Sequence, residues 1–139
     1  PPRVLVDRDP MILVMAEGDI FPCRLASAVG RRFGVAALEP RRGPLRPTLG
    51  ALGGGAAGWG RVRLVLLHHR LRRGLALARC EELVRGEGCP LPVLISAGEE
   101  ALDLRRARAR AAGAADCLVV EPFRVLHLLR VLDQALSAP

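Results

Sequence analysis

The sequence has no lysine and no tyrosine, and its aromatic residues are three Phe and one Trp. All 21 basic side chains are therefore arginine; they occur along the whole chain and give it a net charge of +7. Such a charge favours anionic partners, but surfaces that bind single-stranded nucleic acid also stack aromatic side chains on bases. We therefore expect no direct nucleic-acid binding by this domain. The Gly53–Gly55 run cannot form a Walker A phosphate loop either, because that motif requires a lysine.

Long hydrophobic runs are also absent: the apolar runs are far shorter than the roughly 20 residues that cross a bilayer. We expect no membrane insertion and a cytoplasmic location. Residues 1–3 supply neither an initiator Met nor a signal-peptide core, so we expect a domain from a larger chain that carries an effector. The four cysteines form no C-x-x-C pair and have no His at zinc-finger spacing, which predicts reduced thiols, no structural metal and no cofactor: Cys23, Cys80, Cys89 and Cys117.

What the sequence does contain is one domain's length of alternating patterns. Half of the 139 residues are apolar, which excludes disorder over most of the chain. Short apolar runs predict buried strands, and segments with apolar residues at helical spacing lie between them. The predicted strands are Met11–Ala16, Val35–Leu38, Val62–Leu67, Pro90–Ser96 and Asp116–Val120. The predicted helices are 20–33, 74–86, Glu99–Ala112 and Phe123–Leu136.

Two segments are less well specified. Residues 40–61 are rich in Pro and Gly, so only a short helix near 45–57 is expected there. Residues 1–10 are interpreted as an N-terminal extension or linker. Val4–Asp9 also resembles a first strand with an acidic end, but Met11–Ala16 is preferred because it leaves room for a single helix before the next strand.

The alternation predicts a (βα)5 fold of the flavodoxin type: a doubly wound, five-stranded parallel sheet with helices on both faces. In such sheets, ligands bind at the carboxyl ends of the strands. The polar residues that follow the predicted strands are therefore the candidate site: Glu17, Asp19, His68, Ser96 and Glu121.

Over residues 11–137 the sequence resembles the receiver domains of response regulators, the CheY-like family. The resemblance is carried by an apolar strand with an acidic end before a helix, by two later strands, and by the passage into the last helix. These segments are Met11–Phe33, Val65–His68 with Gly74–Leu77, Pro92–Ala97, and Ala111–Leu118 followed by Glu121-Pro122-Phe123.

The resemblance implies a phosphorylation pocket in which several functional groups are replaced. In that family an Asp after the third strand accepts a phosphoryl group, an acidic pair holds Mg²⁺, and a Ser/Thr and a Lys contact the phosphoryl oxygens. Ser96 matches this pattern. The acidic pair falls on Ala16 and Glu17, the phosphoacceptor on His68, and the lysine on Glu121.

These departures do not depend on the details of the alignment. No Asp occurs between residues 20 and 102, and no Lys occurs anywhere. We therefore expect a degenerate pseudo-receiver pocket that is not phosphorylated on Asp and a domain that is not an enzyme.

Three interpretations of His68 are open. It can fill the former acidic pocket and pair with Glu17 or Glu121, which we favour. It can ligate Zn²⁺ or Mn²⁺ with those carboxylates, although the spacing is not a recognised motif. It can also be a phosphohistidine. Ser96 lacks the G-x-S-x-G elbow of a serine nucleophile.

The predicted fourth helix carries a run of arginines. A solvated helix face is one explanation. The resemblance implies a second, because receiver domains use this surface to bind a protein partner or to form a homodimer. We thus expect a phosphorylation-independent signalling module that acts through protein–protein interaction; the alternative is the regulatory, ligand-sensing domain of an atypical DNA-binding response regulator. The candidate partner-binding residues are Arg105, Arg106, Arg108, Arg110 and Phe123.

Overall fold

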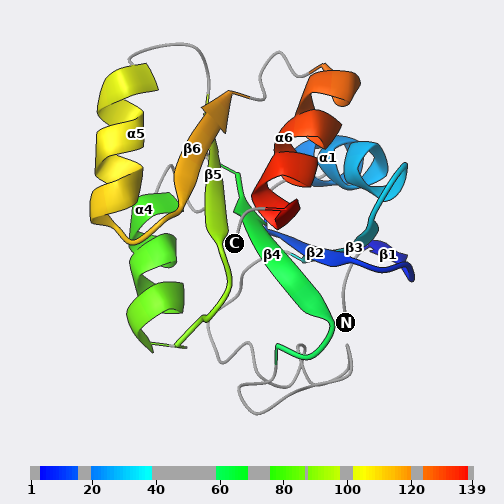
Figure 1. The fold of residues 1–139 in the computed structure, drawn as a ribbon, viewed down its shortest axis with the longest axis horizontal. Coiled ribbons are helices and arrows are strands. Elements are labelled where there is room, and N and C mark those ends of the chain that lie inside the picture. Colours follow the sequence, from blue (N-terminus) through cyan, green and yellow to red (C-terminus); the bar gives the residue numbers. More distant parts are fainter. Residues whose placement is uncertain are drawn as a thin grey trace.

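The computed structural model describes residues 4–15, 20–38, 59–68, 76–86, 88–97, 102–119 and 124–137. These residues form a six-stranded sheet in the order β1-β3-β2-β4-β5-β6 (Figure 1). The strands are β1 (Val4–Val6), β2 (Met11–Met15), β3 (Gly34–Leu38), β4 (Val62–Leu67), β5 (Val93–Ala97) and β6 (Asp116–Val119). The helices are α1 (Ile20–Gly30), α4 (Ala76–Glu81) with a π-helical turn η1 (Glu82–Gly86), α5 (Leu102–Ala111) and α6 (Val125–Ser137).

The five predicted strands are all present and all parallel, which confirms the predicted fold class. The predicted number of strands is wrong, because β1 adds a sixth strand, antiparallel to β3. β1 lies within the segment that was interpreted as an extension or linker. Its Val4 and Val6 side chains pack against the core, whereas Leu5 is exposed. Without β1, β3 would be the edge strand of the parallel sheet. Pairing with β1 gives the main-chain groups on that side of β3 a neighbouring strand.

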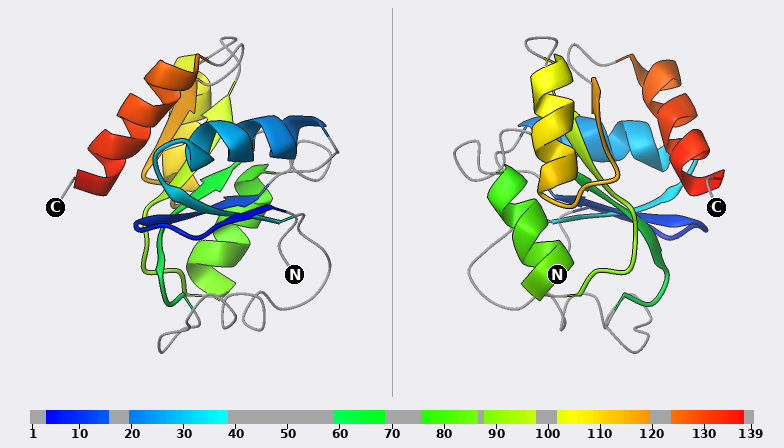
Figure 2. Two further views of the ribbon diagram at one scale, coloured as in Figure 1. Left: turned by 90° about the vertical axis from the view of Figure 1, so that its right-hand side faces the viewer. Right: turned by 60° about the vertical axis from the view of Figure 1, so that its left-hand side comes forward.

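Helices cover both faces of the sheet (Figure 2). On one face, α1 and α6 contribute apolar side chains to a core that includes Ile12, Val14 and Leu66. On the other, α4 and α5 pack over Leu13 and Val65. Every residue of β2 is fully buried, as expected for a central strand covered on both sides.

The N-terminal segment is fixed to the rest of the fold beyond its strand pairing. The Gly34 N–H donates to the Pro10 carbonyl at 2.9 Å, and Arg8 Nη1 donates to the Gly30 carbonyl at 3.1 Å. Arg61 forms an ion pair with Asp7. A Cβ atom at Gly34 would lie 1.9 Å from the Arg8 carbonyl oxygen, so this crossing requires glycine.

The predicted helices occur with shifted ends, and η1 was not predicted. The expected helix at 45–57 lies outside the described residues. Cys80, Cys89 and Cys117 are free thiols, while the side chain of Cys23 lies outside the description. In the described part of the chain, no helix has the length and apolar character needed to span a membrane.

Candidate functional site

The carboxyl ends of β4 and β5 place two of the predicted site residues in the interior. His68 directly follows β4, and its N–H donates to the Met15 carbonyl of β2 at 2.9 Å. Only 3% of His68 is exposed. Ser96, in β5, is fully buried. Both residues have interaction partners in the structure.

The strand register indicates that His68 and Ser96 are neighbours. Leu67 of β4 is aligned with Ile95 of β5, and the next residue along each strand is His68 and Ser96 respectively. Because the strands are parallel and side chains alternate between faces, both point to the face that Leu66 and Leu94 occupy two residues earlier. That is the face covered by α1 and α6. A histidine and a hydroxyl therefore lie at the sheet edge where parallel α/β folds bind ligands.

Other predicted site residues lie outside the described residues, namely Glu17, Asp19, Glu121 and Phe123. Their pairing with His68, and any metal held between them, remain predictions. Within the ranges that the structure describes, no three His, Cys, Asp or Glu side chains gather as a metal site.

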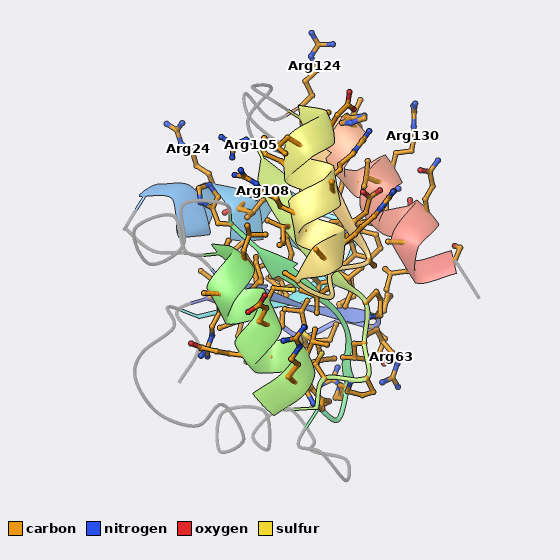
Figure 3. All side chains as sticks on the ribbon, turned by 90° about the vertical axis from the view of Figure 1, so that its left-hand side faces the viewer. Arg24, Arg63, Arg105, Arg108, Arg124 and Arg130 are labelled. Atoms are coloured by element: carbon orange, nitrogen blue, oxygen red, sulfur yellow. The ribbon has the colours of Figure 1, made fainter. Side chains whose placement is uncertain are left out.

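The arginines of α5 divide into two groups. Arg106 and Arg110 turn toward β6: Arg106 Nε donates to the Cys117 carbonyl at 3.1 Å, and Asp116 Oδ1 lies 3.8 Å from Arg106 Nε and 3.7 Å from Arg110 Nη2. Arg105 and Arg108 lie on the side of α5 that faces away from α6 (Figure 3). The predicted partner-binding run is thus not one uniform surface, because part of it is used within the chain.

The structure also shows buried polar groups that the sequence patterns did not single out. Arg79, on α4, is 7% exposed and its Nη1 donates to Glu82 at 2.7 Å. Its Nε and Nη2 atoms are buried without a hydrogen-bond partner among the described residues. The only signal in the sequence is its spacing of three residues from Ala76 on the buried side of the helix.

Burial favours the neutral form of the three cysteine thiols that the structure describes. Burial raises the pKa of Cys80 to about 11, with smaller contributions from Cys89 and Glu81. Burial also raises the pKa of Cys89 and of Cys117. A raised pKa lowers the fraction of thiolate at neutral pH, which disfavours nucleophilic chemistry at these three residues.

No protein-family model matches the chain, and no curated protein sequence matches it significantly. Crystal structures of receiver domains, in contrast, match this chain over most of its length. A response regulator from Thermotoga maritima is 18% identical with a TM-score of 0.65, covering 93% of this chain and 98% of that one. The signal receiver domain of a DNA-binding response regulator from Colwellia psychrerythraea is 18% identical with a TM-score of 0.63, covering 94% and 100%.

A protein described as pilus assembly-related, from Burkholderia pseudomallei, is similar to the same extent. It is 21% identical with a TM-score of 0.65, and the match covers 91% of this chain and 89% of that one.

The strand order of the five parallel strands, β3-β2-β4-β5-β6, is also the order found in flavodoxin and CheY. The chain therefore has the CheY-like receiver fold.

Proposed function

We propose that this domain is a pseudo-receiver: a signalling module that does not use aspartyl phosphorylation, is not an enzyme, and acts by binding another protein. The observation that carries the proposal is the buried His68 at the carboxyl end of β4. Aspartyl phosphorylation needs a carboxylate nucleophile at such a position and cations that stabilise the transferring charge. An imidazole cannot form an acyl phosphate, and the chain has no lysine to supply the ammonium group.

The surroundings of His68 favour a structural role. It is packed beside Ser96 with almost no exposed surface, and buried polar side chains of this kind are usually held by hydrogen bonds. We propose that His68 fills the former pocket and pairs with Glu17 or Glu121. The metal-ligand and phosphohistidine interpretations remain outcomes of the experiments on this site.

Protein binding is proposed from the charge and position of α5. Arg108 and Arg110 are exposed, and the chain carries a net charge of +7. An acidic surface on a partner protein would complement this charge and speed association. We further propose that the module works in the cytoplasm, attached to an effector domain or a larger chain.

Trifluoroberyllate, which mimics a phosphoryl group on a carboxylate, tests the first part of the proposal. The amide NMR signals of His68 and Ser96 would be followed as trifluoroberyllate and Mg²⁺ are added to the wild-type chain and to a His68→Asp variant. We expect no shift in the wild type. Saturable shifts of these two signals in the wild type would show a working acceptor pocket and contradict the proposal.

A second candidate function is the regulatory domain of an atypical DNA-binding response regulator, perturbed by a ligand in the vacated pocket. The observation that favours it is the similarity to the receiver domain of the DNA-binding regulator from Colwellia psychrerythraea. The full-length coding sequence tests this alternative. A helix-turn-helix motif after residue 139 would support it, and a different effector would contradict it.

A further inference from the structure

The outer edge of β6 has an unusual hydrogen-bonding arrangement. β6 is the last strand in the sheet formed by the described residues, and within those residues it pairs with β5. At Cys117 both main-chain groups are bonded to side chains: the N–H donates to Asp116 Oδ1 at 2.8 Å, and the carbonyl accepts from Arg106 Nε at 3.1 Å. Because the N–H and C=O of a strand residue point to the same side, these bonds mark the side of Cys117 that faces away from β5.

An uncovered edge strand is a template on which another chain can pair. The opposite end of the parallel sheet is covered by β1, which pairs with β3 and is itself only three residues long. Among the residues that the structure describes, no strand pairs with the outer edge of β6. The polar groups of Cys117 are instead occupied by two side chains, one from α5 and one from β6 itself.

We propose that Arg106 and Asp116 form an edge cap that prevents β6 of a second copy of this chain from pairing with β6. An antiparallel β6–β6 pair centred on Cys117 would be self-complementary, as a two-fold interface requires. The two Cys117 residues would lie opposite each other and exchange both of their main-chain hydrogen bonds. These are the N–H and the C=O that Asp116 and Arg106 occupy.

The cap is supported by a third side chain and lies at the surface. Asp116 Oδ1 is 3.8 Å from Arg106 Nε and 3.7 Å from Arg110 Nη2, so the carboxylate lies between two guanidinium groups. The Arg106 and Asp116 side chains are both close to half exposed. Hydrogen bonds to charged groups are stronger than neutral ones, so the cap competes well with an incoming strand, yet a substitution can remove it without opening the core.

Sedimentation equilibrium over a wide range of protein concentrations tests the proposal. Arg106→Met removes the guanidinium but keeps an apolar stem, and Asp116→Ala removes the acceptor of the Cys117 N–H. Arg108→Met is the matched control, because it removes the same charge from the same helix on the side away from α6. We expect the weight-average mass of both cap variants to rise toward twice that of the wild type, while the control follows the wild type.

A proline at position 119 tests whether the association of the cap variants occurs through β6. Val119 is two residues beyond Cys117, so its N–H also faces away from β5, and a proline there removes a donor that β6–β6 pairing needs. We expect the Arg106→Met, Val119→Pro double variant to return to the wild-type mass, with circular dichroism showing that each variant is folded. Cap variants that sediment like the wild type, or a double variant that still associates, would overturn the proposal.

Discussion

Residues in the middle of the sheet and residues at its carboxyl end differ in what determines whether they are apolar or polar. All five residues of β2 are apolar and fully buried, so that strand is determined by packing on both faces. One residue beyond β4, His68 is equally enclosed but polar, and Ser96 lies beside it on β5. Packing alone does not require a histidine or a serine there. The two polar residues are therefore explained by the proposed pocket, whereas the apolar residues of β2 are explained by the fold.

The largest expected effect is a loss of stability on substitution of Gly34, where the fold tolerates only glycine. Gly34→Ala would place a Cβ atom 1.9 Å from the Arg8 carbonyl oxygen, so the N-terminal segment would have to move. We expect a loss of about 4 kcal/mol in the free energy of unfolding, measured with urea. Gly86→Ala is the control, because a Cβ there meets no atom within 4 Å. Equal stabilities of the two variants would contradict the packing of β1 and β3 described above.

A core truncation should have the next largest effect. Leu13 is fully buried in β2, and Leu13→Ala should cost about 3 kcal/mol through lost burial and the cavity left behind. Leu5→Ala, at a position that is 55% exposed on β1, should change stability by less than about 0.5 kcal/mol. If both variants unfolded at the same urea concentration, β2 could not be the central strand.

The comparison is sharpened by the two histidines among the described residues, one buried and one exposed. His68→Ala removes a buried polar side chain and should cost about 1–3 kcal/mol, because the groups that it contacts lose a partner. His127→Ala, on the exposed side of α6, should be near neutral. Chemical denaturation of both variants checks this. A neutral His68→Ala would argue against the pocket-filling role.

The smallest expected effect is a pH dependence of the free energy of unfolding in alkaline solution. The chain has no lysine or tyrosine, so the side chains that titrate between about pH 9 and 11 are its cysteines. Burial raises the pKa of Cys80 to about 11, so the folded state retains this proton at a pH where the unfolded state releases it. The resulting stability is complete below about pH 9 and is lost as the pH rises through about 11.

We therefore expect the free energy of unfolding to fall over this interval, and to fall less steeply in a Cys80→Ala variant. Urea unfolding at several pH values gives the slope, which is independent of the cost of the substitution itself. Identical slopes for the two proteins would show that Cys80 does not contribute.

The sequence predicted the central fold because β2, β4 and β5 are apolar runs whose burial follows from local composition. The strand-like pattern at Val4–Asp9 was noted but interpreted as an extension or linker, because β1 is only three residues long and is stabilised by tertiary contacts: its pairing with β3 and the crossing at Gly34. The end of α4 was predicted as an ordinary helix, since nothing in Glu82–Gly86 indicates a π-helical turn.

Some features of the candidate site were predicted from the sequence and others were not. His68 and Ser96 were placed at strand ends from the alternation of elements, and the register of β4 and β5 makes them neighbours. The run of arginines on α5 was visible in the sequence, but its division was not. Only the packing of α5 against β6 shows that Arg106 and Arg110 turn toward Asp116.

The central claim, that the receiver fold is present without its phosphoryl chemistry, is tested most directly by intact mass measurement. The wild-type chain would be incubated with acetyl phosphate and Mg²⁺ and compared with an untreated sample. The pseudo-receiver proposal predicts an unchanged mass. A stoichiometric phosphoryl adduct, on His68 or on any other residue, would contradict it.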